Sequence, residues 1–95
     1  MKFAAVIQYT ADQKLIADTR PNHRAYLTNL LETGRLLACG PFQDDSGALI
    51  IYEADSLEAA QHLVRNDPFN AAGVFVSYEL KPWKVVMGNS ALLLG

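Results

Sequence analysis

Four runs of apolar residues along the chain show the pattern of β-strands. They cover residues 2–9, 35–42, 48–54 and 73–83, are rich in β-branched, aromatic or other apolar side chains, and are bounded by turn-forming residues. The short polar segment 43–47 separates the second run from the third and is typical of a hairpin connection. The pattern therefore predicts four strands, of which the middle two are joined directly.

Two segments between these runs have helical periodicity instead. Pro21 suits the first position of a helix, where its missing N–H is no loss, and Gly34 suits a left-handed cap at the end. The preceding segment, residues 11–19, is ambiguous and fits one loose helical turn. The predicted helix has an apolar side that should face the sheet, formed by Tyr26, Leu27, Leu30 and Leu31.

The second helix is predicted to begin after Ser56, a good N-cap, with Glu58 near the positive end of the helix dipole. Asp67 and Pro68 should end it. Its buried stripe is expected to contain Leu57, Ala60, Leu63 and Val64.

The resulting order, β-α-β-β-α-β, is the split βαβ pattern of ferredoxin-like domains. It predicts an α+β fold with a four-stranded antiparallel sheet. The length of 95 residues suits one domain, and 51% apolar with 19% charged residues is typical of a folded globular chain. We assign residues 1–83 to this domain and residues 84–95 to a C-terminal tail that packs on the domain or on a dimer partner.

Both faces of the predicted sheet are apolar. Ala4 and Val6 in the first strand, like Leu49 and Ile51 in the third, alternate with the residues of the opposite face. An antiparallel sheet facing water should carry polar residues on one side, so this second face is expected to pack on another copy in a homodimer, which could assemble further. The alternative is that the apolar tail folds back over it.

Charge, cysteine content and hydropathy argue against several classes of function. A net charge of −2 gives no electrostatic surface for nucleic acid or anionic lipid, and no stretch reaches the roughly 20 apolar residues of a membrane span. The single cysteine, Cys39, excludes an intrachain disulfide and suits a reducing cytoplasm, and the N-terminal residues show no signal-peptide cleavage site. Without metal-ligand spacing or a glycine-rich phosphate loop, we expect neither a metal site nor a cofactor.

One of the two histidines is placed where burial could matter for its chemistry. At about 100° per residue, His23 falls within the apolar stripe of the first helix, whereas His62 lies roughly 160° from the apolar centre of the second and should be solvated. A histidine in such a stripe is often a core residue whose ring nitrogens are satisfied by the backbone. The alternative is a working acid or base.

Asp67 is the acid that could give His23 a catalytic role. It precedes Pro68 after the second helix, where an aspartate commonly forms a local Asx turn. If its carboxylate meets the imidazole, it would fix the ring tautomer and raise the basicity of the ring, and the free nitrogen could then move a substrate proton. The two residues are 44 positions apart, so spacing alone does not decide whether they meet.

Other residues could line a pocket near this histidine. Arg20 could clamp an anionic substrate, although it could equally be a surface cation. Gly40 and Pro41 end the second strand, either as a pocket wall or as a simple strand exit. Phe69 could line the pocket or belong to the core or an interface. Three residues are expected to be structural, namely Cys39 as a small buried hydrophobe and Asp44 and Asp45 as turn residues.

Four segments together resemble one known family. “RPNH” at 20–23, “GRLLACGPF” at 34–42, “DSLEAAQHLVRNDPF” at 55–69 and “AAGVFVSYELKPW” at 71–83 are similar, in this order, to the YCII-related (YciI-like) family. Each segment alone is weak, but four in register are specific. The resemblance implies a ferredoxin-like fold that forms a dimeric α/β barrel through sheet packing.

The resemblance also implies a cleft built around a His–Asp pair, which corresponds here to His23 and Asp67. Arg20 belongs to the same motif as the histidine, and Gly40 and Pro41 match the residues that border the pocket. One branch of the family resembles a cofactor-free dehydrochlorinase that acts on a chlorinated hydroxyquinol, and related barrel families include muconolactone isomerases.

Two functions follow as hypotheses. The first is a small cofactor-independent lyase, dehydrochlorinase or isomerase-like enzyme acting on a small cyclic or aromatic metabolite. His23 would be its general acid/base and Asp67 the orienting partner, and the substrate-binding residues would be Arg20, Gly40, Pro41 and Phe69. The second is a non-catalytic homodimer that binds a small ligand, as a sensor or an accessory module.

Overall fold

A single antiparallel sheet with strand order β2-β3-β1-β4 organises the chain, in a computed structural model that describes residues 1–95. The elements in chain order are β1 (Lys2–Tyr9), α1 (Gln13–Glu32), β2 (Leu36–Pro41), β3 (Gly47–Glu53), α2 (Leu57–Arg65), α3 (Pro68–Ala71), β4 (Phe75–Trp83) and α4 (Ser90–Leu93). This arrangement confirms the predicted α+β, ferredoxin-like fold.

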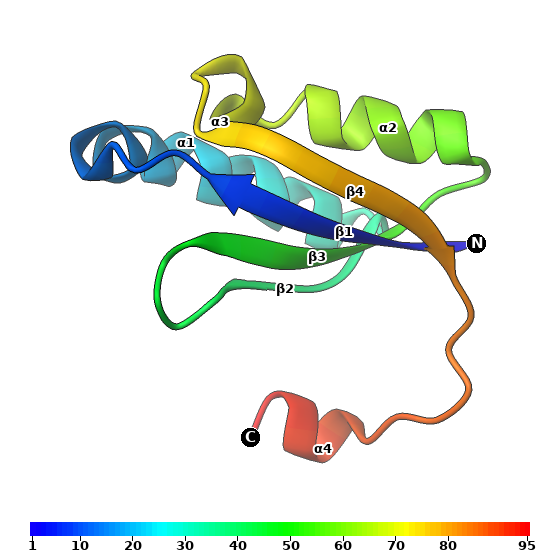
Figure 1. Cartoon of the computed structure of the whole chain (residues 1–95). Coiled ribbons are helices and arrows are strands. Elements are labelled where there is room, and N and C mark those ends of the chain that lie inside the picture. Colours follow the sequence, from blue (N-terminus) through cyan, green and yellow to red (C-terminus); the bar gives the residue numbers. More distant parts are fainter.

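The helices α1, α2 and α3 cover one face of the sheet, and the opposite face has no helix packed against it (Figure 1). β1 lies in the middle, where Phe3 pairs with Tyr52 of β3 on one side and with Pro82 of β4 on the other. The covered face of β1 carries side chains that alternate along the strand and are buried, namely Phe3, Ala5, Ile7 and Tyr9.

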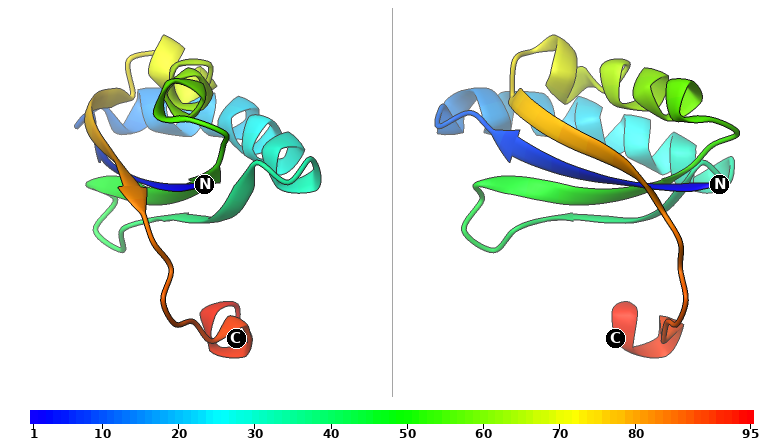
Figure 2. Two further views of the ribbon diagram at one scale, coloured as in Figure 1. Left: turned by 90° about the vertical axis from the view of Figure 1, so that its right-hand side faces the viewer. Right: turned by 45° about the vertical axis from the view of Figure 1, so that its right-hand side comes forward.

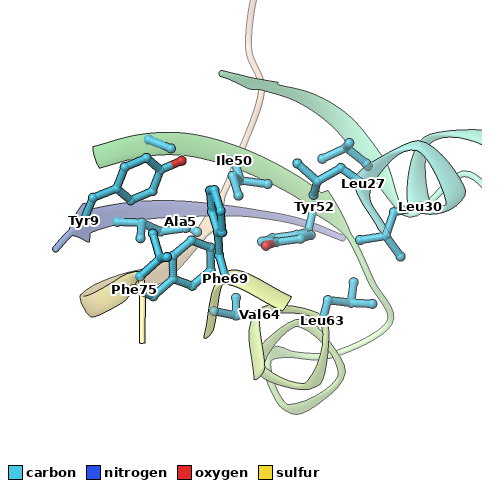
Figure 3. Packing of buried hydrophobic residues seen from close by; sticks show 14 of the residues in the cluster. Ala5, Tyr9, Leu27, Leu30, Ile50, Tyr52, Leu63, Val64, Phe69 and Phe75 are labelled. Atoms are coloured by element: carbon cyan, nitrogen blue, oxygen red, sulfur yellow. The ribbon is translucent and has the colours of Figure 1, made fainter. Parts of the chain in front are cut away.

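The core fills the space between this face and the helices. Aromatic side chains gather at one end, where Tyr9, Phe69 and Phe75 lie together, while Tyr52 and the leucines of α1 and α2 fill the other (Figure 3). Fully burying one such side chain stabilises the fold by about 1.5–3 kcal/mol. The aromatic end of the core also contacts His23, through Phe69 and Phe75.

The first helix begins eight residues earlier than the sequence predicted, at Gln13 instead of Pro21. Asp12 is the N-cap, and its side chain accepts a hydrogen bond from the Leu15 N–H at 3.1 Å. Ile16 extends the buried stripe by a further two turns, so packing against the sheet holds the helix through Pro21 despite the backbone hydrogen bond lost there.

Two leucines predicted on buried helical stripes are instead exposed. Leu31 is 56% exposed and Leu57 is 40% exposed, because each lies at the edge of its stripe, beyond the reach of the sheet. His62 is exposed as predicted. None of the helices is both long enough and apolar enough to cross a membrane.

The chain leaves the domain after β4 and runs away on the side of the sheet opposite to the helices (Figures 1 and 2). Every residue from 84 to 95 is exposed, including the short helix α4. Within one chain, therefore, the tail does not fold back as a cover for the outer face. Val6 and Leu49 on that face stay 50% and 41% exposed, whereas Ile51 is only 8% exposed.

Candidate active site

The fold brings His23 and Asp67 into direct contact. α1 presents His23 on the same buried face as Leu27 and Leu30, and the turn between α2 and α3 presents Asp67 from the opposite side. His23 Nδ1 lies 2.7 Å from Asp67 Oδ1 and 2.9 Å from Oδ2. Asp67 is fully buried and His23 is 7% exposed, so the pair is held in a low-dielectric environment where such contacts are strong.

Asp67 also has the local role that its position before proline indicated. Its Oδ1 accepts a hydrogen bond from the Phe69 N–H at 2.9 Å and caps α3. One carboxylate thus both caps α3 and contacts the imidazole of His23. The turn fixes the carboxylate, and the carboxylate in turn fixes the imidazole.

Aromatic side chains fix the plane of the imidazole. The ring of His23 stacks on Phe69 with centroids 3.8 Å apart and an interplanar angle of 10°, and Phe75 meets it edge-on at 6.1 Å. Because an ionised carboxylate only accepts hydrogen bonds, we assign the ring hydrogen to Nδ1. Nε2 makes no hydrogen bond within the chain, so it is free to accept one from a ligand.

His23 lines a cavity of about 240 Å³ between α1 and the strands β2 and β3. The other lining residues come from β1, α1, β2 and β3 and are Tyr9, Arg20, Arg24, Leu27, Cys39, Gly40, Pro41, Ala48 and Ile50. None of them is acidic, and about half of the lining is apolar. The predicted residues Arg20, Gly40 and Pro41 therefore lie beside His23 in one cavity.

Phe69, for which both a pocket lining and a place in the core were considered, does not line this cavity. It is fully buried and lies against the face of the imidazole, because its ring completes the aromatic end of the core. Phe69 therefore affects the site only through its stacking contact with the imidazole of His23.

Arg20 is held by an ion pair that the sequence did not indicate. Its Nη2 lies 3.2 Å from Oδ1 of Asp45, in the loop between β2 and β3. Asp45 adopts a positive φ of 61°, a conformation in which aspartate is more tolerated than most residues. Asp45 is thus more than the turn residue expected, because it neutralises one guanidinium beside the cavity.

Three lining residues with polar groups were not assigned to the site from the sequence. Burial raises the pKa of Tyr9 to about 12, with the Arg20 charge opposing that shift, so the phenol is a neutral donor at physiological pH. Arg24 follows Arg20 by four residues, a helical spacing that could have identified it. Cys39 is exposed, which corrects the expectation of a buried hydrophobe, because this residue lines the cavity and does not belong to the packed core.

A larger and more open hollow, of about 840 Å³, lies next to the loop between β2 and β3. Its lining includes Val6, Gln8 and Glu79 but neither histidine. No group of three or more histidine, cysteine, aspartate or glutamate side chains is positioned to hold a metal ion.

Comparison with known proteins identifies relatives along most of the chain. The profile of the family described as YCII-related domain matches residues 1–84. The protein YciI of Escherichia coli O6:H1 (strain CFT073) is 43% identical over 77 residues, which cover 70% of this chain and 79% of that protein. The uncharacterized protein YjpA of Bacillus subtilis (strain 168) is 42% identical over 65 residues, covering 66% and 73% respectively.

Two solved structures resemble the fold. One is 5-chloro-2-hydroxyhydroquinone dehydrochlorinase (TftG) of Burkholderia phenoliruptrix AC1100 in complex with 2,5-dihydroxybenzoquinone, with a TM-score of 0.78, 29% identity, and coverage of 88% of this chain and 94% of that chain. The other is muconolactone isomerase, with a TM-score of 0.62, 12% identity, and coverage of 95% and 93%. These likenesses agree with the predicted subunit fold of the dimeric α/β barrel class.

Proposed function

The chain belongs to the YCII-related family, and we propose that it is a cofactor-independent acid/base enzyme of the lyase or isomerase type. Its substrate is a small cyclic or aromatic metabolite bound in the cavity beside His23. The observation that carries this proposal is the state of the imidazole, whose Nδ1 is held by the buried Asp67 while Nε2 remains open. The likeness to a dehydrochlorinase at 29% identity supports the reaction class.

In the proposed reaction, Nε2 of His23 takes a proton from the substrate. The electron pair of the broken bond then forms a double bond within the substrate. In a dehydrochlorination, chloride leaves from the adjacent carbon, and in an isomerisation His23 returns the proton to another atom. The carboxylate of Asp67 stabilises the imidazolium that forms, and it keeps the ring in the orientation that presents Nε2.

The neighbouring residues bind and position the substrate. Arg20, already oriented by Asp45, and the neutral hydroxyl of Tyr9 can donate hydrogen bonds to substrate oxygens. Gly40 and Pro41 form the wall on the β2 side. We assign this activity to a reducing cytoplasm, in keeping with the free thiol of Cys39.

The test is a chloride-release and product assay on a chlorinated hydroxyquinol, extended to other small cyclic metabolites. A positioned acid/base contributes about 10²- to 10⁴-fold, so the variant His23→Ala should lose that much in kcat. His62→Ala is the matched control, because His62 is exposed and lies outside the cavity. Full activity of the His23→Ala variant on a substrate that the protein turns over would refute the catalytic role and favour a ligand-binding module.

We further propose that the protein is a homodimer built through the outer face of the sheet. Val6 and Leu49 expose apolar surface there, and in the tail Val86 and Leu92 are 74% and 77% exposed. Exposed apolar surface of this kind marks interaction sites. Residues 1–83 would be the dimerising domain, with the tail, 84–95, packing on the partner subunit. Sedimentation at micromolar concentration tests this, and a monomer would contradict it.

A further inference from the structure

The cavity is lined by hydrogen-bond donors and positive charge but by no carboxylate. Tyr9, Arg20, Arg24 and Cys39 line it and can donate hydrogen bonds, and Nε2 of His23 is an acceptor there, whereas no aspartate or glutamate lines it. Asp67 is fully buried behind the imidazole, with both of its oxygens already in contact with Nδ1. A ligand in this cavity therefore meets donors and positive charge.

The two arginines differ in how their charge is compensated. Arg20 is paired with Asp45 at 3.2 Å and is half-buried. Arg24, one helical turn further along the same side of α1, makes no ion pair and no side-chain hydrogen bond within the chain. One full positive charge at the cavity is thus left without a partner.

We propose that Arg24 binds a carboxylate of the substrate, so that the substrate of this site is a small cyclic organic acid. This inference rests on the proposed function and adds the substrate class to it. The planar guanidinium matches a carboxylate with two parallel hydrogen bonds. The substrate carboxylate would compensate the charge of Arg24 as Asp45 compensates that of Arg20.

The size and the apolar part of the cavity define the rest of the substrate. A volume of about 240 Å³ lies below the range of about 300–1,000 Å³ found for drug-sized ligands, which limits the substrate to a body of about one ring. Leu27, Pro41, Ala48 and Ile50 provide apolar surface for that ring. The contact between the substrate carboxylate and Arg24 would then orient the substrate ring toward His23, the residue before Arg24 in α1.

The experiment compares two probes that share a ring and differ in charge, 2,5-dihydroxybenzoate and 2,5-dihydroxybenzamide. Each is titrated into the full-length, ¹⁵N-labelled protein, and binding is followed through the amide shifts of the cavity residues. We expect the benzoate to bind about tenfold more tightly or better, because a charge-assisted contact distinguishes the two. Arg24→Gln should remove most of this advantage, because it weakens the binding of the charged benzoate far more than that of the neutral benzamide.

Arg65→Gln is the matched control, because Arg65 is also exposed and unpaired but lies outside the cavity. It should leave both affinities as they are in the unmodified protein. Equal binding of the two probes, an advantage that survives Arg24→Gln, or no cavity shifts with either probe at millimolar concentration would each overturn the inference.

The two proposals fail separately. If the benzoate preference depends on Arg24 but His23→Ala retains full turnover, the binding inference stands and the proposed function falls. If His23→Ala abolishes turnover and the probes bind equally, the catalytic assignment stands and the substrate class is wrong.

Discussion

Nδ1 of His23 contacts both carboxylate oxygens of Asp67, at 2.7 and 2.9 Å, across 44 positions of sequence. One of those oxygens, Oδ1, also accepts a hydrogen bond from the Phe69 N–H, and the Phe69 ring stacks on the imidazole. The same short turn therefore supplies the acid that orients the histidine and the aromatic ring that holds its plane. Phe69 holds one face of the imidazole and Asp67 holds Nδ1, so the position of Nε2 is fixed before a substrate binds. Proton transfer to Nε2 then needs little rearrangement of the site.

Asp67→Asn tests this orienting role. The side-chain oxygen of asparagine can still cap α3 through Phe69, but its amide donates hydrogen bonds and favours the opposite tautomer of His23. We expect a folded variant whose kcat on an identified substrate falls by about 10²- to 10⁴-fold. Unchanged kcat would show that the carboxylate does not assist the histidine.

Asp67→Ala separates structure from catalysis. This variant loses the cap on α3 and the contact with His23 together, and hydrogen bonds to charged groups contribute about 1.5–3 kcal/mol each. The free energy of unfolding, measured by urea denaturation, should therefore fall by at least that amount. Asp67→Asn should lose less, and equal losses in the two variants would argue against the capping role.

Tyr52 carries a fully buried hydroxyl without a hydrogen-bond partner, and burial raises the pKa of its phenol strongly. An unsatisfied buried polar group costs about 1–3 kcal/mol. Tyr52→Phe keeps the ring among the leucines of the core (Figure 3) and removes that cost, so we expect the free energy of unfolding to stay the same or to rise by about 1 kcal/mol. A clear loss of stability in urea would instead indicate a partner for the hydroxyl, such as an internal water.

Cys39 should behave as a slow thiol despite its exposure to the cavity. Burial by the surrounding protein, and next the charge of Asp67, raise the pKa of this thiol above its usual value of 9.0. The thiolate is the reactive form, so iodoacetamide should label Cys39 more slowly than free N-acetylcysteine at neutral pH, and labelling should accelerate above about pH 9. Since Cys39 is the single thiol, mass spectrometry reports its labelling directly. Faster labelling than the free thiol at neutral pH would contradict this account.

Glu53 links the N-terminus to the sheet and makes stability depend on acid pH. Its contacts with the N-terminal ammonium at 2.8 Å and with Lys2 at 3.3 Å lower the pKa of its carboxyl below the usual 4.5. Because the pKa of Glu53 is lower in the folded than in the unfolded protein, its ionised carboxyl adds to the free energy of unfolding above pH 4.5. This contribution is lost as the pH falls through the pKa of the folded protein. Urea midpoints of the unmodified protein and of Glu53→Gln should therefore differ more near neutral pH than near pH 3. A difference independent of pH would contradict this contribution.

The sequence predicted the strands and the order of the elements because alternation along a strand is a local property. It identified His23 and Asp67 as candidates, but their contact depends on how α1 packs against the turn before α3, which no local pattern encodes. Pro21 was misleading as a helix start, because tertiary packing of Ile16 outweighs the lost hydrogen bond. Arg24 was not assigned to the site, although its spacing of four residues from Arg20 places both on one side of a helix, because the sequence does not show that a cavity lies on that side.

The tautomer of His23 shows whether Asp67 holds Nδ1 and leaves Nε2 free for proton transfer. Long-range ¹H–¹⁵N correlation spectra of the imidazole rings report which nitrogen carries the hydrogen in the neutral form, and the exposed His62 serves as the internal reference. We expect the hydrogen on Nδ1 of His23 in the unmodified protein and on Nε2 in the variant Asp67→Asn. A hydrogen on Nε2 in the unmodified protein, or a tautomer that Asp67→Asn leaves unchanged, would contradict it.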